Sequence, residues 1–166
     1  MAVLRPGYGV FRINKNLESH LRPASESDRD FLYSLHCTTM RAVIEKTWGW
    51  NDAWQQADFS KRLSECVVSI IEVEDRPAGC LWLNSKSDSL HIVELQVVPE
   101  LQGKGLGTAT VMRVIKDGTD RGIAVTLSVV PANPRAKRLY ERLGFEVTAV
   151  EDPFIHMRRK PAPSET

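Results

Sequence analysis

The chain has 166 residues, of which 42% are hydrophobic and 26% are charged, proportions that exclude an intrinsically disordered chain, a coiled coil and a collagen-like fibre. The length predicts one domain over residues 1–166. The 22 basic and 21 acidic residues leave a net charge of +1, so the charge balance gives no sign of a nucleic-acid partner or an anionic membrane.

The first part of the chain predicts a short strand and two helices. Residues 1–15 read as an irregular lead-in, because one proline and two glycines interrupt them, and a strand is expected over 16–24. A helix start follows at 25–28, where polar capping residues and early acids precede apolar residues at helical spacing. The helical pattern is interrupted at 48–52, where Asn51 or Asp52 is the expected cap of a second helix.

The middle of the chain changes to strand patterns. Three β-branched or apolar runs at 67–73, 78–84 and 90–98 are separated by short turns, which predicts an antiparallel meander. A helical pattern then begins at Gly105 and ends at Gly118 or Gly122.

The last third of the chain alternates strand and helix. A continuous apolar strand is expected at 123–130, followed by a helix that Asn133 caps and Gly144 ends. Two closing strands at 145–150 and 154–160 lead into a short tail that ends at residue 166.

This order of elements predicts an α/β (α+β) fold. We expect a mixed, largely antiparallel central sheet of six to seven strands, with helices on both faces. The strands at 90–98 and 123–130 flank one helix, so the crossover makes them parallel neighbours.

Cysteine and histidine spacing gives no sign of a metal site. The three cysteines form no C-x-x-C pair and the four histidines are scattered, so neither a disulfide framework nor a bound metal is expected. The sequence has no apolar run near the roughly 20 residues that a membrane span needs, and it predicts a cytoplasmic protein.

The most informative stretch is the glycine-rich loop between the strand at 90–98 and the following helix. Alternate glycines at Gly103, Gly105 and Gly107 open a helix whose free amides and partial positive charge suit a phosphate. The loop fits neither a P-loop nor a dinucleotide fingerprint. A methyltransferase-like G-x-G-x-G pattern matches, although the next strand lacks the acid that such a site needs.

Two blocks of this chain resemble the GCN5-related N-acetyltransferases, the GNAT superfamily. Gln102-x-x-Gly105-x-Gly107 resembles the family's R/Q-x-x-G-x-G/A motif, and it follows a strand that ends in Pro99. The run from Asn133 to Phe145, with its alanine and its tyrosine before Gly-Phe, resembles the second block of the family. The resemblance covers residues 66–159 well and residues 21–65 less well.

The resemblance implies acetyl-CoA as cofactor, bound by a core over residues 67–159, with residues 21–66 on the acceptor side. In the family two parallel strands splay, and the opened strand edge and the loop amides hold the cofactor. One of Arg135, Lys137 and Arg138 would reach the nucleotide phosphates. The cofactor-binding residues implied are Leu95, Val97, Val98, Gln102, Gly103, Lys104, Gly105, Leu106, Gly107, Thr108, Asn133, Ala136 and Tyr140.

The resemblance also implies an acid and a base. Tyr140 matches the tyrosine that protonates the leaving thiolate. His91 and Glu94 are the candidate bases. Strict alternation puts His91 on the face of Val97 and Glu94 on the other face, and a bulge would change that parity.

Four tryptophans are candidates for binding the acceptor: Trp48, Trp50, Trp54 and Trp82. Their rings suit an apolar or cationic amine. The function implied is acetyl transfer from acetyl-CoA to a primary amine of a small molecule or peptide, in a protein that forms a homodimer in many members of the family. Two alternatives remain open: a CoA-binding module without catalysis, and a methyltransferase-like nucleotide binder.

Overall fold

The computed structural model describes residues 11–14 and 17–163, which form one mixed sheet and the helices that cover it. Two short 3-10 turns lie at Glu26–Asp28 and Pro99–Leu101. The other elements, in chain order, are β1 (Phe11–Asn14), β2 (Leu17–Pro23), α1 (Arg29–Trp48), α2 (Asp52–Glu65), β3 (Val67–Val73), β4 (Arg76–Ser85), β5 (Ser89–Val97), α3 (Leu106–Asp120), β6 (Ala124–Val129), α4 (Pro134–Arg142), β7 (Glu146–Glu151) and β8 (Phe154–Arg159).

The predicted fold class is confirmed, with one more strand than expected. Within the described residues the strand order is β1-β2-β3-β4-β5-β6-β8-β7, an eight-stranded sheet in place of six or seven strands. The extra strand, β1, lies in the predicted irregular lead-in and pairs antiparallel with β2. Its residues alternate apolar and polar, a strand pattern that the proline and the two glycines upstream obscured. Residues 1–10 and 15 of that lead-in, and 164–166 of the tail, lie outside the described residues.

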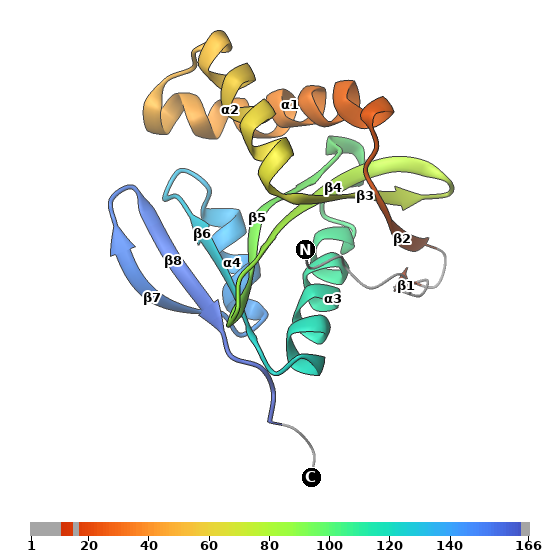
Figure 1. The fold of residues 1–166 in the computed structure, drawn as a ribbon, viewed down its shortest axis with the longest axis vertical. Coiled ribbons are helices and arrows are strands. Elements are labelled where there is room, and N and C mark those ends of the chain that lie inside the picture. The colour runs from red at the N-terminus through yellow and green to blue at the C-terminus, as the bar shows by residue number, and fades with distance from the viewer. Residues whose placement is uncertain (1–10, 15–16, 164–166) are drawn as a thin grey trace.

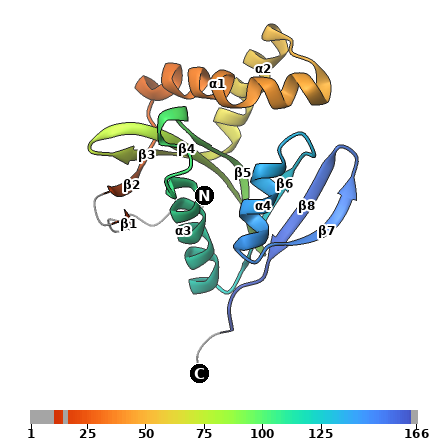
Figure 2. The ribbon, with the colours of Figure 1, turned by 180° about the vertical axis from the view of Figure 1, so that it is seen from behind.

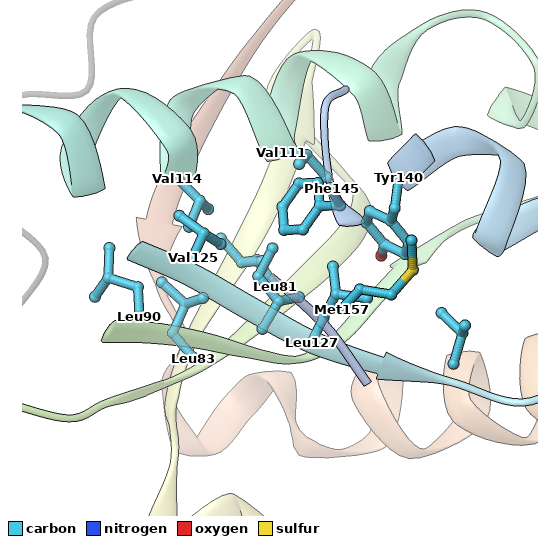
Figure 3. Packing of buried hydrophobic residues seen from close by; sticks show 12 residues of the cluster. Leu81, Leu83, Leu90, Val111, Val114, Val125, Leu127, Tyr140, Phe145 and Met157 are labelled. Atoms are coloured by element: carbon cyan, nitrogen blue, oxygen red, sulfur yellow. The ribbon is translucent and has the colours of Figure 1, made fainter. Parts of the chain in front are cut away.

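Helices cover both faces of the sheet (Figures 1 and 2). Helices α1 and α2 cross one face, where Leu32, Leu35 and Phe59 pack against strand residues such as Ile70 and Trp82. Helices α3 and α4 lie on the opposite face (Figure 2). Figure 3 shows that second core, in which α3, α4 and the strands β4, β5, β6 and β8 contribute Val111, Tyr140, Leu81, Leu90, Leu127 and Met157.

Asparagine side chains fix where two of the helices begin. Asn51 accepts a hydrogen bond from the Trp54 amide at 2.9 Å, which selects it over Asp52 as the cap of α2. Asn133 accepts from the Ala136 amide at 3.2 Å at the start of α4. Both caps agree with the sequence prediction, and both bring the first turn of a helix to the same region of the molecule.

The parallel pair β5–β6 opens partway along its length. Its register runs from Ser89 with Ala124 to Ile92 with Leu127 and stops there. Beyond that point β5 continues to Val97 against β4, while β6 continues to Val129 against β8. A bulge between Trp82 and Leu83 leaves Val93 without a partner on β4, and bulges bend a strand. The two strands therefore separate into a V whose open end faces α1 and α2 (Figure 1).

Candidate active site

A cavity of about 740 Å³ occupies the open end of the V. Its walls come from α1, α2, β5, β6 and α4 and from the first residue of β8, so segments from both halves of the chain meet there. The chemically active side chains in its lining are His36, Asp58, Arg62, Glu94, Ser128 and Tyr140.

The glycine loop lies between the end of β5 and the start of α3. Gly103 and Gly105 have φ values of 74° and 86°, a left-handed conformation that disfavours residues with a side chain. The first backbone amide to bond inside α3 is that of Ala109, which donates to the Gly105 carbonyl. Of the described amides, those of residues 103–108 have no partner, which leaves a row of free donors at a helix N-terminus.

One basic side chain borders this loop. A Cβ atom added to Gly103 would lie 3.4 Å from Nη2 of Arg135, so the guanidinium lies beside the loop backbone. Lys137 forms an ion pair with Glu141 on the surface of α4. Arg135, one of the three basic residues that the sequence left open, therefore lies next to the loop.

The remaining cofactor candidates divide into cavity-lining and loop-supporting residues. Leu95, Asn133 and Ala136 line the cavity. Gln102 donates a hydrogen bond from Nε2 to the Val97 carbonyl at 3.0 Å, which holds the loop against the end of β5. The amide of Val98 donates to the Ala78 carbonyl at 2.9 Å, so this amide is part of the sheet and is not free for a ligand. Leu106, the first residue of α3, is buried against the sheet, and the other loop residues predicted from the sequence are Lys104, Gly107 and Thr108.

Tyr140 reaches the cavity from the face of the sheet that carries α3 and α4. Its ring packs edge-on against Phe145 with ring centroids 5.5 Å apart (Figure 3). Burial raises the pKa of Tyr140 to about 12, so its hydroxyl keeps its proton at neutral pH. No described residue bonds the hydroxyl, which leaves it free to donate into the cavity.

The bulge in β5 decides on which face of the sheet each of the two candidate bases lies. Leu90 and Ile92 pack toward α3, and so does Leu95, because Val93 adds one residue between them. His91 and Glu94 consequently share the face that α1 and α2 cover, although strict alternation would separate them. Only Glu94 lines the cavity.

Glu94 is held by two basic side chains. Its carboxylate accepts from Nη1 of Arg62 and lies 3.7 Å from Nδ1 of His36, whose Nε2 lies 2.9 Å from Oε1 of Gln55. Burial alone would raise the pKa of Glu94, but the contact with His36 and the charge of Arg62 outweigh it and lower that pKa. Burial would lower the pKa of His36, and the contact with Glu94 and the hydrogen bond to Gln55 raise it instead. Glu94 is therefore a charged group with its partners already in place.

His91 lies outside the cavity lining. Its Nδ1 lies 2.9 Å from the hydroxyl of Thr126 on the neighbouring strand. Burial lowers the pKa of His91, and the nearby charges of Lys86 and His156 lower it further.

His156 on β8, which no sequence pattern singled out, contacts a residue of the cavity wall. Ser128 lines the cavity from β6, and its hydroxyl lies 2.7 Å from Nδ1 of His156. The other ring nitrogen of His156 lies 3.4 Å from the carboxylate of Glu151. The sequence could not supply this contact, because it depends on the register that pairs Ser128 with His156 across two strands.

The four tryptophans have different positions. Trp48 and Trp54 line the cavity and are 54% and 60% exposed. Trp50 lies outside the lining and donates from Nε1 to Asp52 at 2.8 Å, with the guanidinium of Arg41 over its ring. Trp82 is 1% exposed, lies in the core under α2 and is not in the lining either.

In residues 11–14 and 17–163, no three His, Cys, Asp or Glu side chains are grouped so that they could hold a metal ion. None of the described helices has the length and apolar character to cross a membrane.

Comparison with known protein families gives one clear match. The sequence profile of the family described as "Acetyltransferase (GNAT) family" matches residues 29–145. An uncharacterized N-acetyltransferase of Methanocaldococcus jannaschii is 31% identical over 150 residues, which are 84% of this chain and 66% of that protein. The chain spans 34–66% of the length of the curated relatives it matches.

Solved structures share the fold at low sequence identity. The PaiA N-acetyltransferase of Thermoplasma acidophilum, solved in complex with coenzyme A, has a TM-score of 0.67 at 16% identity. The match covers 86% of this chain and 98% of that one. The ribosomal-protein-S18-alanine N-acetyltransferase of Escherichia coli has a TM-score of 0.66 at 20% identity, over 89% of this chain and 96% of that one.

Proposed function

Since the chain belongs to the GNAT acetyltransferase family, we propose that it transfers the acetyl group of acetyl-CoA to a primary amine of a small molecule. The observation that carries the proposal is the V between β5 and β6, which leads from a loop with free amides to a cavity with an unbonded tyrosine hydroxyl. When bound, acetyl-CoA supplies a thioester, and attack by the amine on its carbonyl carbon gives an amide and the CoA thiol.

The residues present fit a cofactor that carries a diphosphate and an extended amide-containing arm. The amides of residues 103–108 and the guanidinium of Arg135 offer donors and positive charge to phosphate oxygens. The unpaired edge of β5 near Leu95 offers backbone partners for the arm. Asn133 uses its oxygen to cap α4, and its side-chain nitrogen remains available as a donor.

Tyr140 acts as the general acid in this proposal. A thiolate with a pKa near 8.5 leaves more easily when a proton is donated to it. The buried Tyr140 hydroxyl stays protonated and faces the cavity from α4, which supports this role.

We assign the removal of the amine proton to Ser128 and His156. The amine N–H donates to the Ser128 oxygen while the Ser128 O–H donates to Nδ1 of His156, so the proton ends on the imidazole. The carboxylate of Glu151 beside the other ring nitrogen stabilises the imidazolium that forms.

Glu94 has a different part in the proposal. Its charge is balanced by Arg62 and its pKa is lowered, so it binds a proton weakly. It fixes Arg62 and His36 in the cavity wall and keeps that wall close to neutral.

The proposed function is tested by incubating the protein with acetyl-CoA and a panel of amines. Free CoA is measured by chromatography, because Cys37 and Cys66 are partly exposed and would react with a thiol reagent. Release of CoA that depends on the amine supports the proposal. Tight CoA binding without release on any amine would instead identify a CoA-binding module without catalysis.

A further inference from the structure

We propose that the acceptor is an amine with a single positive charge on an aromatic or apolar body, and that polyamines and other multiply charged amines are poor acceptors. This inference rests on the proposed function and names the substrate class of the same site. Two independent features of the cavity carry it: the aromatic residues at its mouth and the pairing of every acid in its lining.

Aromatic side chains gather at the mouth of the cavity from distant parts of the chain. Trp48 at the end of α1, Trp54 in the first turn of α2 and Phe154 at the start of β8 all line it. The rings of Trp48 and Phe154 have their centroids 5.6 Å apart. These three side chains stay 54%, 60% and 39% exposed, although large apolar groups gain free energy when they are covered. An aromatic body that enters the mouth would cover all three.

The turn that presents the tryptophans is held in place. Asn51 caps α2 at the Trp54 amide, and the Gly49 amide donates to the Glu45 carbonyl to close α1. Trp50 packs its ring 6.0 Å from His36 and donates to Asp52. Trp50 thus holds the turn in place, while the residues on either side of Trp50 line the cavity. Binding of an acceptor therefore costs little conformational entropy in this turn.

The charged groups in the lining leave no place for a second ammonium. The two acids are Asp58 and Glu94, and Arg62 bonds both, with Nε lying 2.8 Å from Asp58. His36 adds a second contact to Glu94. A polyamine would have to displace Arg62 or leave an ammonium in the cavity without a counter-charge, and burying an unpaired charge is costly.

Between the mouth and these charges the wall is apolar. Met40, Val43 and Ile44 line the cavity along one side of α1. An aromatic or branched apolar body suits this wall, since burial of apolar surface is its main source of binding free energy.

The test compares three amines with acetyl-CoA: phenethylamine, ethylamine and spermidine. We expect kcat/KM for phenethylamine to exceed that for ethylamine by about fiftyfold, from burial of one ring, and to exceed that for spermidine by at least as much. Spermidine equal to or better than phenethylamine would overturn the inference while leaving acetyl transfer intact. Absence of CoA release with all amines, in a protein that is folded, would end the proposed function and this inference together.

Variants of Trp54 test whether the preference for phenethylamine depends on the aromatic side chains at the mouth of the cavity. Trp54→Ala should raise KM for phenethylamine about tenfold and leave KM for ethylamine within about twofold, because ethylamine does not reach the ring. Trp54→Phe keeps an aromatic ring and should restore most of the phenethylamine affinity. Met112→Ala removes another exposed large apolar side chain, on α3 and outside the cavity, and serves as the matched control. An equal rise in KM for both amines in Trp54→Ala would contradict a contact with the acceptor body.

Discussion

The side-chain nitrogen of Gln102 lies 3.0 Å from the carbonyl of Val97, five residues earlier, and ties the glycine loop to the end of β5. This hydrogen bond holds the loop that offers free amides against the strand that forms one arm of the V. It therefore helps to fix where the loop lies relative to the cavity.

Removing this bond should weaken CoA binding without unfolding the protein. Gln102→Ala deletes one hydrogen bond at an exposed position, worth about 1 kcal/mol, so the Kd for CoA should rise about fivefold. Isothermal titration calorimetry measures it. Gln56→Ala, on the exposed face of α2, is the matched control, and equal affinities in the two variants would show that the bond does not position the loop.

The left-handed backbone of the loop makes a prediction about stability. Gly105→Ala should lower the free energy of unfolding by about 1 kcal/mol, because alanine resists a φ of 86°. Gly107→Ala should cost less, since its added Cβ would meet Leu139 and Leu95 no closer than 3.9 Å. Urea unfolding of the two variants compares them directly. A larger loss in Gly107→Ala would contradict the strain argument.

Tyr140→Phe should separate catalysis from binding. Loss of the proton donor should lower kcat about a hundredfold, while the Kd for CoA stays within about twofold. Tyr33→Phe, outside the cavity lining, controls for the loss of a tyrosine hydroxyl elsewhere. An unchanged kcat in Tyr140→Phe would remove the acid from the proposed mechanism.

Ser128 and His156 should behave as a unit. Ser128→Ala and His156→Gln should each lower kcat/KM about tenfold or more, and the double variant should be little worse than either one. His20→Gln, which disturbs a histidine bonded to Glu72 on the far strands, is the control. Additive losses would mean that the two side chains do not share one proton path.

The His36–Glu94 contact predicts how stability changes with pH. The pKa of His36 lies above its usual 6.5 in the folded protein, so its charged form adds stability that is fully present below about pH 6.5. That stability is lost as the pH rises through the higher folded value. His36→Gln should therefore cost more free energy of unfolding at about pH 5.5 than at about pH 9. Urea unfolding at the two pH values measures the difference, and a cost that grows with pH would reverse the assignment.

The sequence predicted most of the framework because the framework depends on local patterns. Period-2 and period-3.6 spacing located the strands and helices of the core, and the asparagine before Pro134 located the start of α4. The parallel neighbours β5 and β6 followed from one helix between two strands.

The details of the site depend on contacts that no local pattern encodes. The bulge at Val93 decides that Glu94 and His91 share a face, and the sequence could only name it as one possibility. The contact between Ser128 and His156 requires the register of β6 against β8, 28 residues apart in the chain. Burial of Trp82 and exposure of Trp54 likewise depend on which face of the sheet α2 covers.

The most direct test of the account is a crystal structure of this chain with CoA. It should contain the diphosphate with its oxygens about 2.7–3.2 Å from backbone nitrogens of residues 103–108, beside the guanidinium of Arg135. The arm should run along the open edge of β5 toward Tyr140. A diphosphate bound anywhere else on the protein would contradict the binding site proposed at residues 103–108, and with it each role derived for the cavity.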